Sequence, residues 1–414
     1  MSETPAAART PRRTPRVLSS SLLGAMFLMA TSAIGPGFIT QTTDFTARLG
    51  AAFAFAILVS VLVDIAVQLN VWRVIGVTET RAQDLANKVL PGAGYLLSAL
   101  IVFGGIVFNV GNIAGTALGL DALAGVDMKA GGALSAAVAV ALFLLRGAGV
   151  ALDRILVGLG VLMIGLTLYV AFVSRPPAGE ALRQAVLPGD VGGDLFLATV
   201  TLIGGTVGGY ITYAGAHRLV DSGQGGIRNV DAVTRTSVVG IVVTGIMRVL
   251  LFLAVLGVVT GGAAVLDAPN PPAAAFAAAA GDTGKRLFGL IMWAAAISSV
   301  IGASYTSVSF VSTFSAGLTR NRNWLVAGFI ALCTALYLGL GQAPQTLLIL
   351  AGALNGLILP AGLGVMLWVA ARHRRDLLHG YPYPAWLLAI GVLAWLVTVY
   401  IAANSLGGIA DLWS

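Results

Sequence analysis

Three charged residues lie inside long apolar stretches of this 414-residue chain: Asp44, Asp64 and Arg248. A charge in such a segment is costly and is a functional candidate by default. Asp44 can act in coupling or gating, or it can form a structural pair with Arg48, one turn away on the same helix face. Asp64, four residues before Gln68, can relay protons or accept a structural hydrogen bond. Arg248 is expected to pair with a carboxylate or to snorkel.

Uncharged polar residues also gather inside apolar stretches. Asn109 and Asn112 are three residues apart, so they share one helix face. They can line a path through the protein or bridge neighbouring helices. Ser298 and Ser299 begin a polar run that extends to Ser307. This run can line a cavity, although Ser and Thr hydroxyls also bond back to helix carbonyls.

Two glycine-rich sequences interrupt apolar stretches, one in each half of the chain. The first is Gly-Pro-Gly at 35–37, and the second is Gly-Gly-Thr-Val-Gly-Gly at 204–209. Pro36 lacks an N–H group and disfavours a helical conformation at Gly35, so a helix break is predicted there. Either interruption alone could simply kink or pack a helix. Because both fall at corresponding positions of two halves, we favour a substrate site.

The residues that enzymes use are not clustered in this sequence. The three histidines, His217, His373 and His379, lie outside the apolar stretches and form no pattern with Cys or carboxylates. The single cysteine, Cys333, excludes an intrachain disulfide. No G-x-x-x-x-G-K-S/T phosphate loop occurs. We therefore expect no enzyme activity, no catalytic residues, no metal site and no cofactor.

Composition identifies the elements that must position these residues. Hydrophobic residues make up 57% of the chain and charged residues only 10%, whereas soluble domains carry about 25% charged residues. This predicts an all-α integral membrane protein with about eleven spans, each long enough to cross about 30 Å of hydrocarbon. The predicted spans are 18–48, 51–73, 94–120, 131–146, 155–174, 194–215, 236–260, 286–317, 323–341, 346–371 and 385–404.

The basic residues indicate how these spans are oriented. A cytoplasmic N-terminus places most of the 24 Lys and Arg residues on cytoplasmic segments. The net charge of +7 is therefore a topology signal, and no nucleic-acid partner is needed to explain it. We expect a multi-pass protein of a bacterial-type inner membrane, with its C-terminus outside.

Eleven spans can be divided into two repeats of five and one extra span. Because each repeat has an odd number of spans, the second repeat crosses the membrane in the orientation opposite to the first. The predicted segments are a basic cytoplasmic tail (1–17), a first five-helix repeat (18–174), an extracellular loop (175–193), a second, inverted repeat (194–371), a basic cytoplasmic loop (372–384), and an eleventh helix with the C-terminus (385–414).

A helix break within a membrane leaves backbone N–H and C=O groups without helical hydrogen-bond partners, and these groups can bind a ligand. One broken end exposes N–H groups that suit an anion, and the other exposes C=O groups that suit a cation. The predicted substrate-binding residues are Ser32, Gly35, Gly37, Phe38, Gln41, Gly205, Thr206, Gly208, Gly209 and Tyr210. The predicted coupling or pathway residues are Asp44, Asp64, Asn109, Asn112, Ser298 and Ser299.

These residues resemble motifs of the NRAMP family of proton-coupled divalent-metal transporters. Residues 35–38, Gly-Pro-Gly-Phe, are similar to the family's Asp-Pro-Gly-Asn, and residues 203–210 are similar to its Ile-Gly-Ala-Thr-Val-Met-Pro-His. Residues 296–299 resemble its eighth span, and Leu359-Pro360 its tenth. The resemblance covers most of the chain. It implies a LeuT-like 5+5 inverted repeat plus one extra helix, with helices 1 and 6 broken.

The ligand positions depart from the family pattern. The family's metal-binding Asp, Asn and Met correspond here to Gly35, Phe38 and Gly208, its acidic pair to Asn109 and Asn112, and its sixth-span His to Tyr210. Carboxylate and thioether ligands select transition metals. A site without them is expected to hold Mn²⁺ or Fe²⁺ poorly, and its N–H ends are free to face an anion.

The sequence therefore predicts a secondary active transporter that works by alternating access, with H⁺- or Na⁺-coupled uptake of a small organic anion. The chain resembles a divergent bacterial branch of the family, and that resemblance implies a carboxylate such as 5-oxoproline. A divalent cation (Mg²⁺ or Mn²⁺) is the alternative substrate, because Mg²⁺ keeps several waters and needs few carboxylates. A third possibility is a protein that binds without transporting. A monomer in the lipid bilayer is compatible with each of these.

Overall fold

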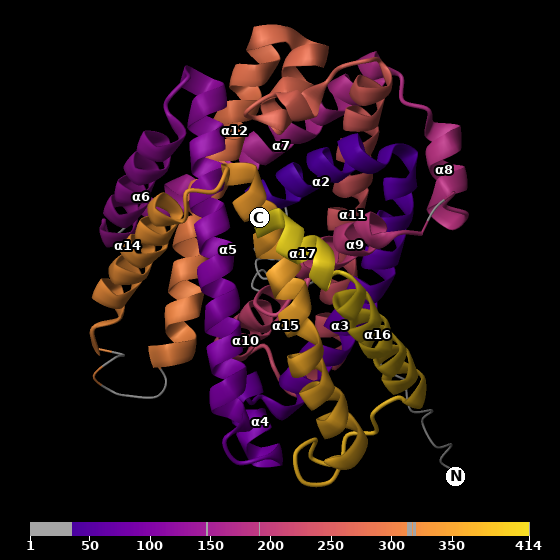
Figure 1. The fold of residues 1–414 in the computed structure, drawn as a ribbon. Coiled ribbons are helices and arrows are strands. Elements are labelled where there is room, and N and C mark those ends of the chain that lie inside the picture. The colour runs from indigo at the N-terminus through magenta and orange to yellow at the C-terminus, as the bar shows by residue number, and fades with distance from the viewer. Residues whose placement is uncertain (1–34, 146–147, 190, 313–316, 318–319, 414) are drawn as a thin grey trace, which may run out of the picture.

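A computed structural model describes residues 35–145, 148–189, 191–312, 317 and 320–413 (Figure 1). Throughout these ranges the chain forms helices and connections, without a strand. The first part of the predicted span 18–48, including Ser32, lies outside the described residues.

The helices are α2 (Pro36–Leu49), α3 (Phe53–Thr78), α4 (Ala82–Val89), α5 (Ala93–Ala124), α6 (Met128–Leu144), α7 (Ala148–Ser174), α8 (Ala178–Val186), α9 (Gly193–Thr206), α10 (Ile211–Asp221), α11 (Val230–Thr260), α12 (Pro271–Ser312), α14 (Arg322–Leu340), α15 (Pro344–Arg372), α16 (Ala385–Asn404) and α17 (Leu406–Trp413).

Most of these helices coincide with predicted spans. Among the described residues, eight helices are long and apolar enough to cross a membrane, or nine if the bent pair Gly158–Ser174 and Ala178–Val186 forms one span. In this count α2 and α3 form one continuous stretch, Pro36–Thr78. The protein is thus a helical multi-pass membrane protein, and the number eleven stays a prediction.

Glycines allow the long helices to approach one another closely. The helix α5 runs the height of the molecule and packs against α12 (Figure 1). A Cβ added at Gly119 of α5 would lie 2.5 Å from the Trp293 backbone N of α12, and one added at Gly289 of α12 would lie 2.5 Å from the Leu123 N of α5. Such close contact between backbones is typical of helix packing in membranes.

The predicted interruption of the sixth span is confirmed as a true unwinding. The helix α9 ends at Thr206, α10 begins at Ile211, and the four residues between them form a turn. The Gly209 N–H in this turn donates a hydrogen bond to the Asn355 carbonyl of α15, 2.8 Å away. The backbone of the break is therefore satisfied by a neighbouring helix rather than by lipid.

The predicted interruption at residues 35–37 determines where α2 begins. Gly35 is extended, with φ −99° and ψ −173°, and Pro36 is the first helical residue. This follows from the geometry of the residue before a proline. Gly35 carries no side chain that could cap the helix, so among the described residues the first N–H groups of α2 receive no side-chain cap from the N-cap position.

The buried core surrounds the start of α2 and the turn between α9 and α10. One apolar cluster joins α3, α10 and α15 around Trp72, Tyr213 and Leu363. A second joins α2, α5 and α12 and includes Phe38 and Met292. The breaks lie between these clusters, because Val207 belongs to the first and Phe38 to the second.

Candidate functional site

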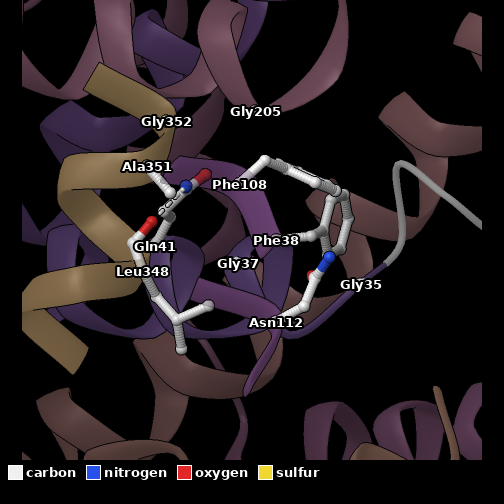
Figure 2. A pocket seen from close by; sticks show the side chains of 10 residues that line it. All are labelled: Gly35, Gly37, Phe38, Gln41, Phe108, Asn112, Gly205, Leu348, Ala351 and Gly352. Atoms are coloured by element: carbon white, nitrogen blue, oxygen red, sulfur yellow. Dashed lines mark hydrogen bonds between the residues drawn. The ribbon is translucent and has the colours of Figure 1, made fainter. Parts of the chain in front are cut away.

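A small cavity lies where the start of α2 meets the end of α9. Segments from four parts of the bundle line it: the start of α2, the middle of α5, the end of α9 and the first third of α15 (Figure 2). The lining residues are Gly35, Gly37, Phe38, Gln41, Phe108, Asn112, Gly205, Leu348, Ala351 and Gly352. The enclosed space has room for about one water molecule.

The structure brings several predicted site residues together in this cavity. From the predicted substrate-binding set, it collects Gly35, Gly37, Phe38, Gln41 and Gly205. Asn112, predicted as a pathway residue, also lines it. These residues come from three helices that are far apart in sequence, so residues of both interruptions line one cavity, and its role as a substrate site stays a prediction.

Other predicted residues support the break without lining the cavity. The Thr206 hydroxyl donates to the Leu202 carbonyl at 2.8 Å. The Tyr210 hydroxyl donates to the Ala303 carbonyl at 3.0 Å, and its ring lies 5.7 Å from that of Phe108, centre to centre. A Cβ at Gly208 would overlap the backbone of Gly204. These positions shape the turn, and their role in binding stays a prediction, as does that of Gly209.

The remaining predicted pathway residues lie elsewhere in the bundle. The Asn109 amide donates to the Ser304 hydroxyl of α12 at 2.9 Å, so Asn109 bridges two helices. Ser298 and Ser299 are half-buried in α12 and do not line this cavity. A pathway role for these three residues stays a prediction.

Two buried amides present unpaired atoms at the cavity. Gln41 Nε2 donates to the Leu348 carbonyl at 3.0 Å, while its Oε1 has no hydrogen-bond partner (Figure 2). The Asn112 Nδ2 likewise has no partner, and both side chains are at most 2% exposed. An unpaired buried donor or acceptor is unfavourable unless a ligand or water completes it. Together with the N-terminal end of α2, these atoms give the cavity a polar lining, and its role in binding stays a prediction.

Among the described residues, the cavity lining carries no side chain that commonly binds transition metals. Its ten lining residues include no carboxylate, imidazole, thiolate or thioether. Over the ranges that the structure describes, no group of three or more His, Cys, Asp or Glu side chains is placed to hold a metal ion. The oxygen donors present at the cavity are amide and backbone carbonyl groups. Such oxygens suit a hard, hydrated cation better than Mn²⁺ or Fe²⁺.

Sequence reasoning missed one whole wall of the cavity. Leu348, Ala351 and Gly352 come from α15, and Phe108 comes from α5. These residues carry no charge and resemble ordinary membrane-span residues. The Gly352-x-x-x-Gly356 spacing is the signal that could have indicated α15, because small residues four apart mark a close helix contact.

The charged residues separate into two arrangements. Asp44 forms an ion pair with Arg48 at 2.7 Å, with the Arg48 side chain 49% exposed. This is the structural pair considered from the sequence, and a coupling role for Asp44 stays a prediction. Asp64 and Arg248 are both nearly inaccessible and interact electrostatically within the bundle.

Arg248 lies directly behind the cavity wall. Its guanidinium carbon is 4.3 Å from the centre of the Phe38 ring, and its Nη2 donates to the Thr206 hydroxyl at 3.3 Å. The Thr206 hydroxyl is also within hydrogen-bonding reach of the Asp64 carboxyl. Thr206 therefore connects the buried cation and the buried anion at the end of α9, and Phe38 stands between this group and the cavity.

Comparisons with solved structures define the class of protein. A manganese transporter of Eremococcus coleocola superposes with a TM-score of 0.71 at 17% identity, over 96% of this chain and 89% of that one. The structure of MhsT in complex with L-phenylalanine superposes with a TM-score of 0.67 at 16% identity, over 94% of this chain and 100% of that one. The fold is thus the all-helical fold of the LeuT-like transporters, and the division into two five-helix repeats stays a prediction.

Sequence comparison identifies the family. Residues 26–407 match the family model described as natural resistance-associated macrophage protein-like (Nramp). The chain belongs to this family and is a membrane transporter. The membrane protein YcsG of Bacillus subtilis (strain 168) is 48% identical over 396 residues, covering 95% of this chain and 96% of that protein. The resemblance inferred from residues 35–38 and 203–210 is confirmed.

Proposed function

We propose that this protein is a secondary active transporter that takes up a small organic anion, with a carboxylate such as 5-oxoproline as the substrate class. The observation that carries this proposal is the lining of the cavity at the two breaks. Among the described residues, that lining combines a helix start without a side-chain cap and an unpaired Asn112 donor, and it includes no carboxylate.

A carboxylate fits these groups chemically. The N-terminal end of α2 carries partial positive charge and directs N–H groups toward an anion. Asn112 Nδ2 supplies a further donor. The rings of Phe38 and Phe108 can cover an apolar body, and Gln41 Oε1 can accept a hydrogen bond from a polar group on it. Because the cavity holds about one water molecule, the surrounding helices must separate to admit a substrate, as alternating access requires.

The same site offers a negative end for a coupling cation. The last carbonyl groups of α9, before the turn at 207–210, carry partial negative charge. We propose H⁺ or Na⁺ as the coupling ion and a bacterial-type inner membrane as the location, with the five-helix repeats at 18–174 and 194–371.

Divalent-cation transport is the second candidate. Membership in the Nramp-like family and the shared fold of the Eremococcus coleocola manganese transporter favour it. The available ligands would be Gln41 Oε1 and backbone carbonyls, which suit Mg²⁺ that retains most of its waters.

Uptake into proteoliposomes separates these candidates. Purified protein is tested in parallel with labelled 5-oxoproline, Mn²⁺ and Mg²⁺, each with and without proton and sodium gradients. Saturable, gradient-dependent uptake of 5-oxoproline without metal flux is the expected result. Metal flux without 5-oxoproline uptake would establish the second candidate. Binding of either solute without any flux would indicate a protein that binds without transporting.

A further inference from the structure

A buried pair of opposite charges lies beside the cavity, outside its lining. Arg248 belongs to α11 and is 2% exposed, and Asp64 belongs to α3 and is 1% exposed. They meet at Thr206, the last residue of α9 before the break. A buried charge is tolerated only when an opposite charge compensates it. Asp64 and Arg248 therefore compensate each other's charge.

Each member of the pair has an unused hydrogen-bonding atom. Arg248 Nη1 and Asp64 Oδ1 are both buried without a partner. A guanidinium has five N–H donors in a planar fork that matches a carboxylate. One Arg248 N–H donates to the Thr206 hydroxyl, and the guanidinium carbon lies over the Phe38 ring. The unpaired Nη1 N–H groups therefore remain available to a carboxylate near the cavity.

Asp64 and Arg248 act electrostatically on each other. In the described part of the chain, Arg248 is the charged group that acts on Asp64, and Asp64 is the one that acts on Arg248. Two groups in contact with the pair, Thr206 from α9 and Phe38 from α2, are neutral. With both residues charged, the site carries no net charge. A substrate carboxylate placed beside Arg248 would leave one uncompensated negative charge in a low-dielectric interior.

Resting on the anion transport proposed above, we propose that Arg248 binds the substrate carboxylate when the Phe38 ring moves aside, and that Asp64 then takes up the coupling proton. The proton passes from water to a carboxylate oxygen of Asp64 and leaves a neutral acid. One anion and one proton thus enter together, and the loaded site is electrically neutral. Asp64 releases the proton on the inner side as the anion leaves Arg248.

The experiment measures binding and uptake of labelled 5-oxoproline over a range of pH and membrane potential. In the wild-type protein, apparent affinity should weaken with rising pH by up to about tenfold per pH unit, the limit for one linked proton. A proton gradient should drive uptake, and a membrane potential alone should not. In Asp64→Asn, affinity should no longer depend on pH, and uptake should respond to membrane potential because the anion crosses without a proton.

The arginine is tested by two substitutions. Arg248→Gln should weaken binding about ten- to hundredfold, the range expected for losing a hydrogen bond to a charged group. Arg248→Lys keeps the charge without the planar fork and should retain part of the affinity. The double variant Asp64→Asn/Arg248→Gln buries no charge, so it tests the arginine even if Arg248→Gln alone fails to fold.

A surface pair supplies the matched control. Asp282 and Arg286 form an ion pair at 2.8 Å with both side chains more than 60% exposed. Asp282→Asn and Arg286→Gln should leave affinity and pH dependence unchanged. If the wild-type protein neither binds nor transports carboxylates, the proposed function fails. If it transports them while Asp64→Asn keeps its pH dependence, or both arginine variants bind with undiminished affinity, the role of the pair is overturned and the proposed function stands.

Discussion

At the scale of single residues, the cavity differs from a transition-metal site by a few substitutions. Gly35 and Phe38 stand where the family resemblance placed metal ligands, and neither can coordinate an ion through its side chain. The polar side chains that remain at the cavity are the amides of Gln41 and Asn112. Amides carry no charge, so we expect the sign of the ligand to depend on the helix dipoles at the cavity and on Arg248 behind Phe38.

Substitution of Asn112 by Asp tests that sign. Asn112→Asp replaces an unpaired donor with a carboxylate of similar size. Two like charges in a buried site repel, so 5-oxoproline uptake should fall at least about tenfold, equivalent to about 1.4 kcal/mol. The measurement is the initial rate of uptake as a function of substrate concentration. Asn404→Asp, at an exposed position of α16, is the control for adding a carboxylate. Increased metal uptake in Asn112→Asp with undiminished 5-oxoproline uptake would contradict the anion site.

Substitution of Asp44 separates its two candidate roles. Its carboxylate is already held by Arg48, and it does not line the cavity. We therefore expect Asp44→Asn to keep the proton and sodium dependence of uptake and to lose at most about 1 kcal/mol of stability, as is usual for a partly exposed ion pair. The readouts are gradient-dependent uptake and thermal unfolding. Loss of gradient dependence would give the coupling role to Asp44.

At the scale of elements, the site depends on the contact between α9 and α15. The Gly209 N–H donates to the Asn355 carbonyl. The Asn355 Nδ2 donates in turn to the Gly104 carbonyl of α5 at 3.1 Å. A Cβ at Gly204 of α9 would collide with the Gly352 carbonyl of α15. The break is thus held open by backbone groups of a helix more than a hundred residues away in sequence.

A single methyl group should disturb this contact. In Gly356→Ala, the new Cβ would lie 2.5 Å from the Val200 carbonyl of α9. Overpacking of this kind costs about 1–3 kcal/mol, so the unfolding temperature of the purified protein should fall and uptake should decrease. Gly328→Ala, at an exposed position of α14 with no described heavy atom within 4 Å of the added Cβ, should leave both unchanged. An unaltered Gly356→Ala protein would show that the two helices can separate without cost.

At the scale of the whole molecule, the arrangement of the helices has a defined polarity. The start of α12 and the connection that follows α15 lie at opposite ends of the bundle (Figure 1). That connection carries the basic cluster Arg372, Arg374 and Arg375. Positive charge on short connections marks the cytoplasmic side, so this end should face the cytoplasm.

Cysteine labelling tests this orientation. The native Cys333 is buried, and Cys333→Ser removes it. In that background, Asp282→Cys and Asp376→Cys place thiols at exposed positions separated by three predicted spans. A membrane-impermeant maleimide should label Asp282→Cys in intact cells and Asp376→Cys only in permeabilised cells. The reverse pattern would invert the topology, and equal labelling of both in intact cells would contradict the number of crossings between them.

Local features of the sequence were sufficient to predict several parts of this protein. The long apolar stretches predicted the helices, because the cost of exposing polar backbone to lipid depends on composition. Pro36 predicted the start of α2 because it restricts its own backbone and that of Gly35. The glycines at 204–209 predicted the second break. These properties depend on residues that are adjacent along the chain.

Only the tertiary structure decided which residues meet at the breaks. Leu348 and Gly352 of α15 complete the cavity, while Tyr210 and Gly209 face other helices. Arg248 lies behind Phe38 although the two are more than two hundred residues apart. The sequence by itself therefore determined the helices, the breaks and the absence of metal-binding side chains at positions 35 and 38. Packing between distant helices determined the composition of the site, because the close approach of two helices depends on both of their surfaces at once.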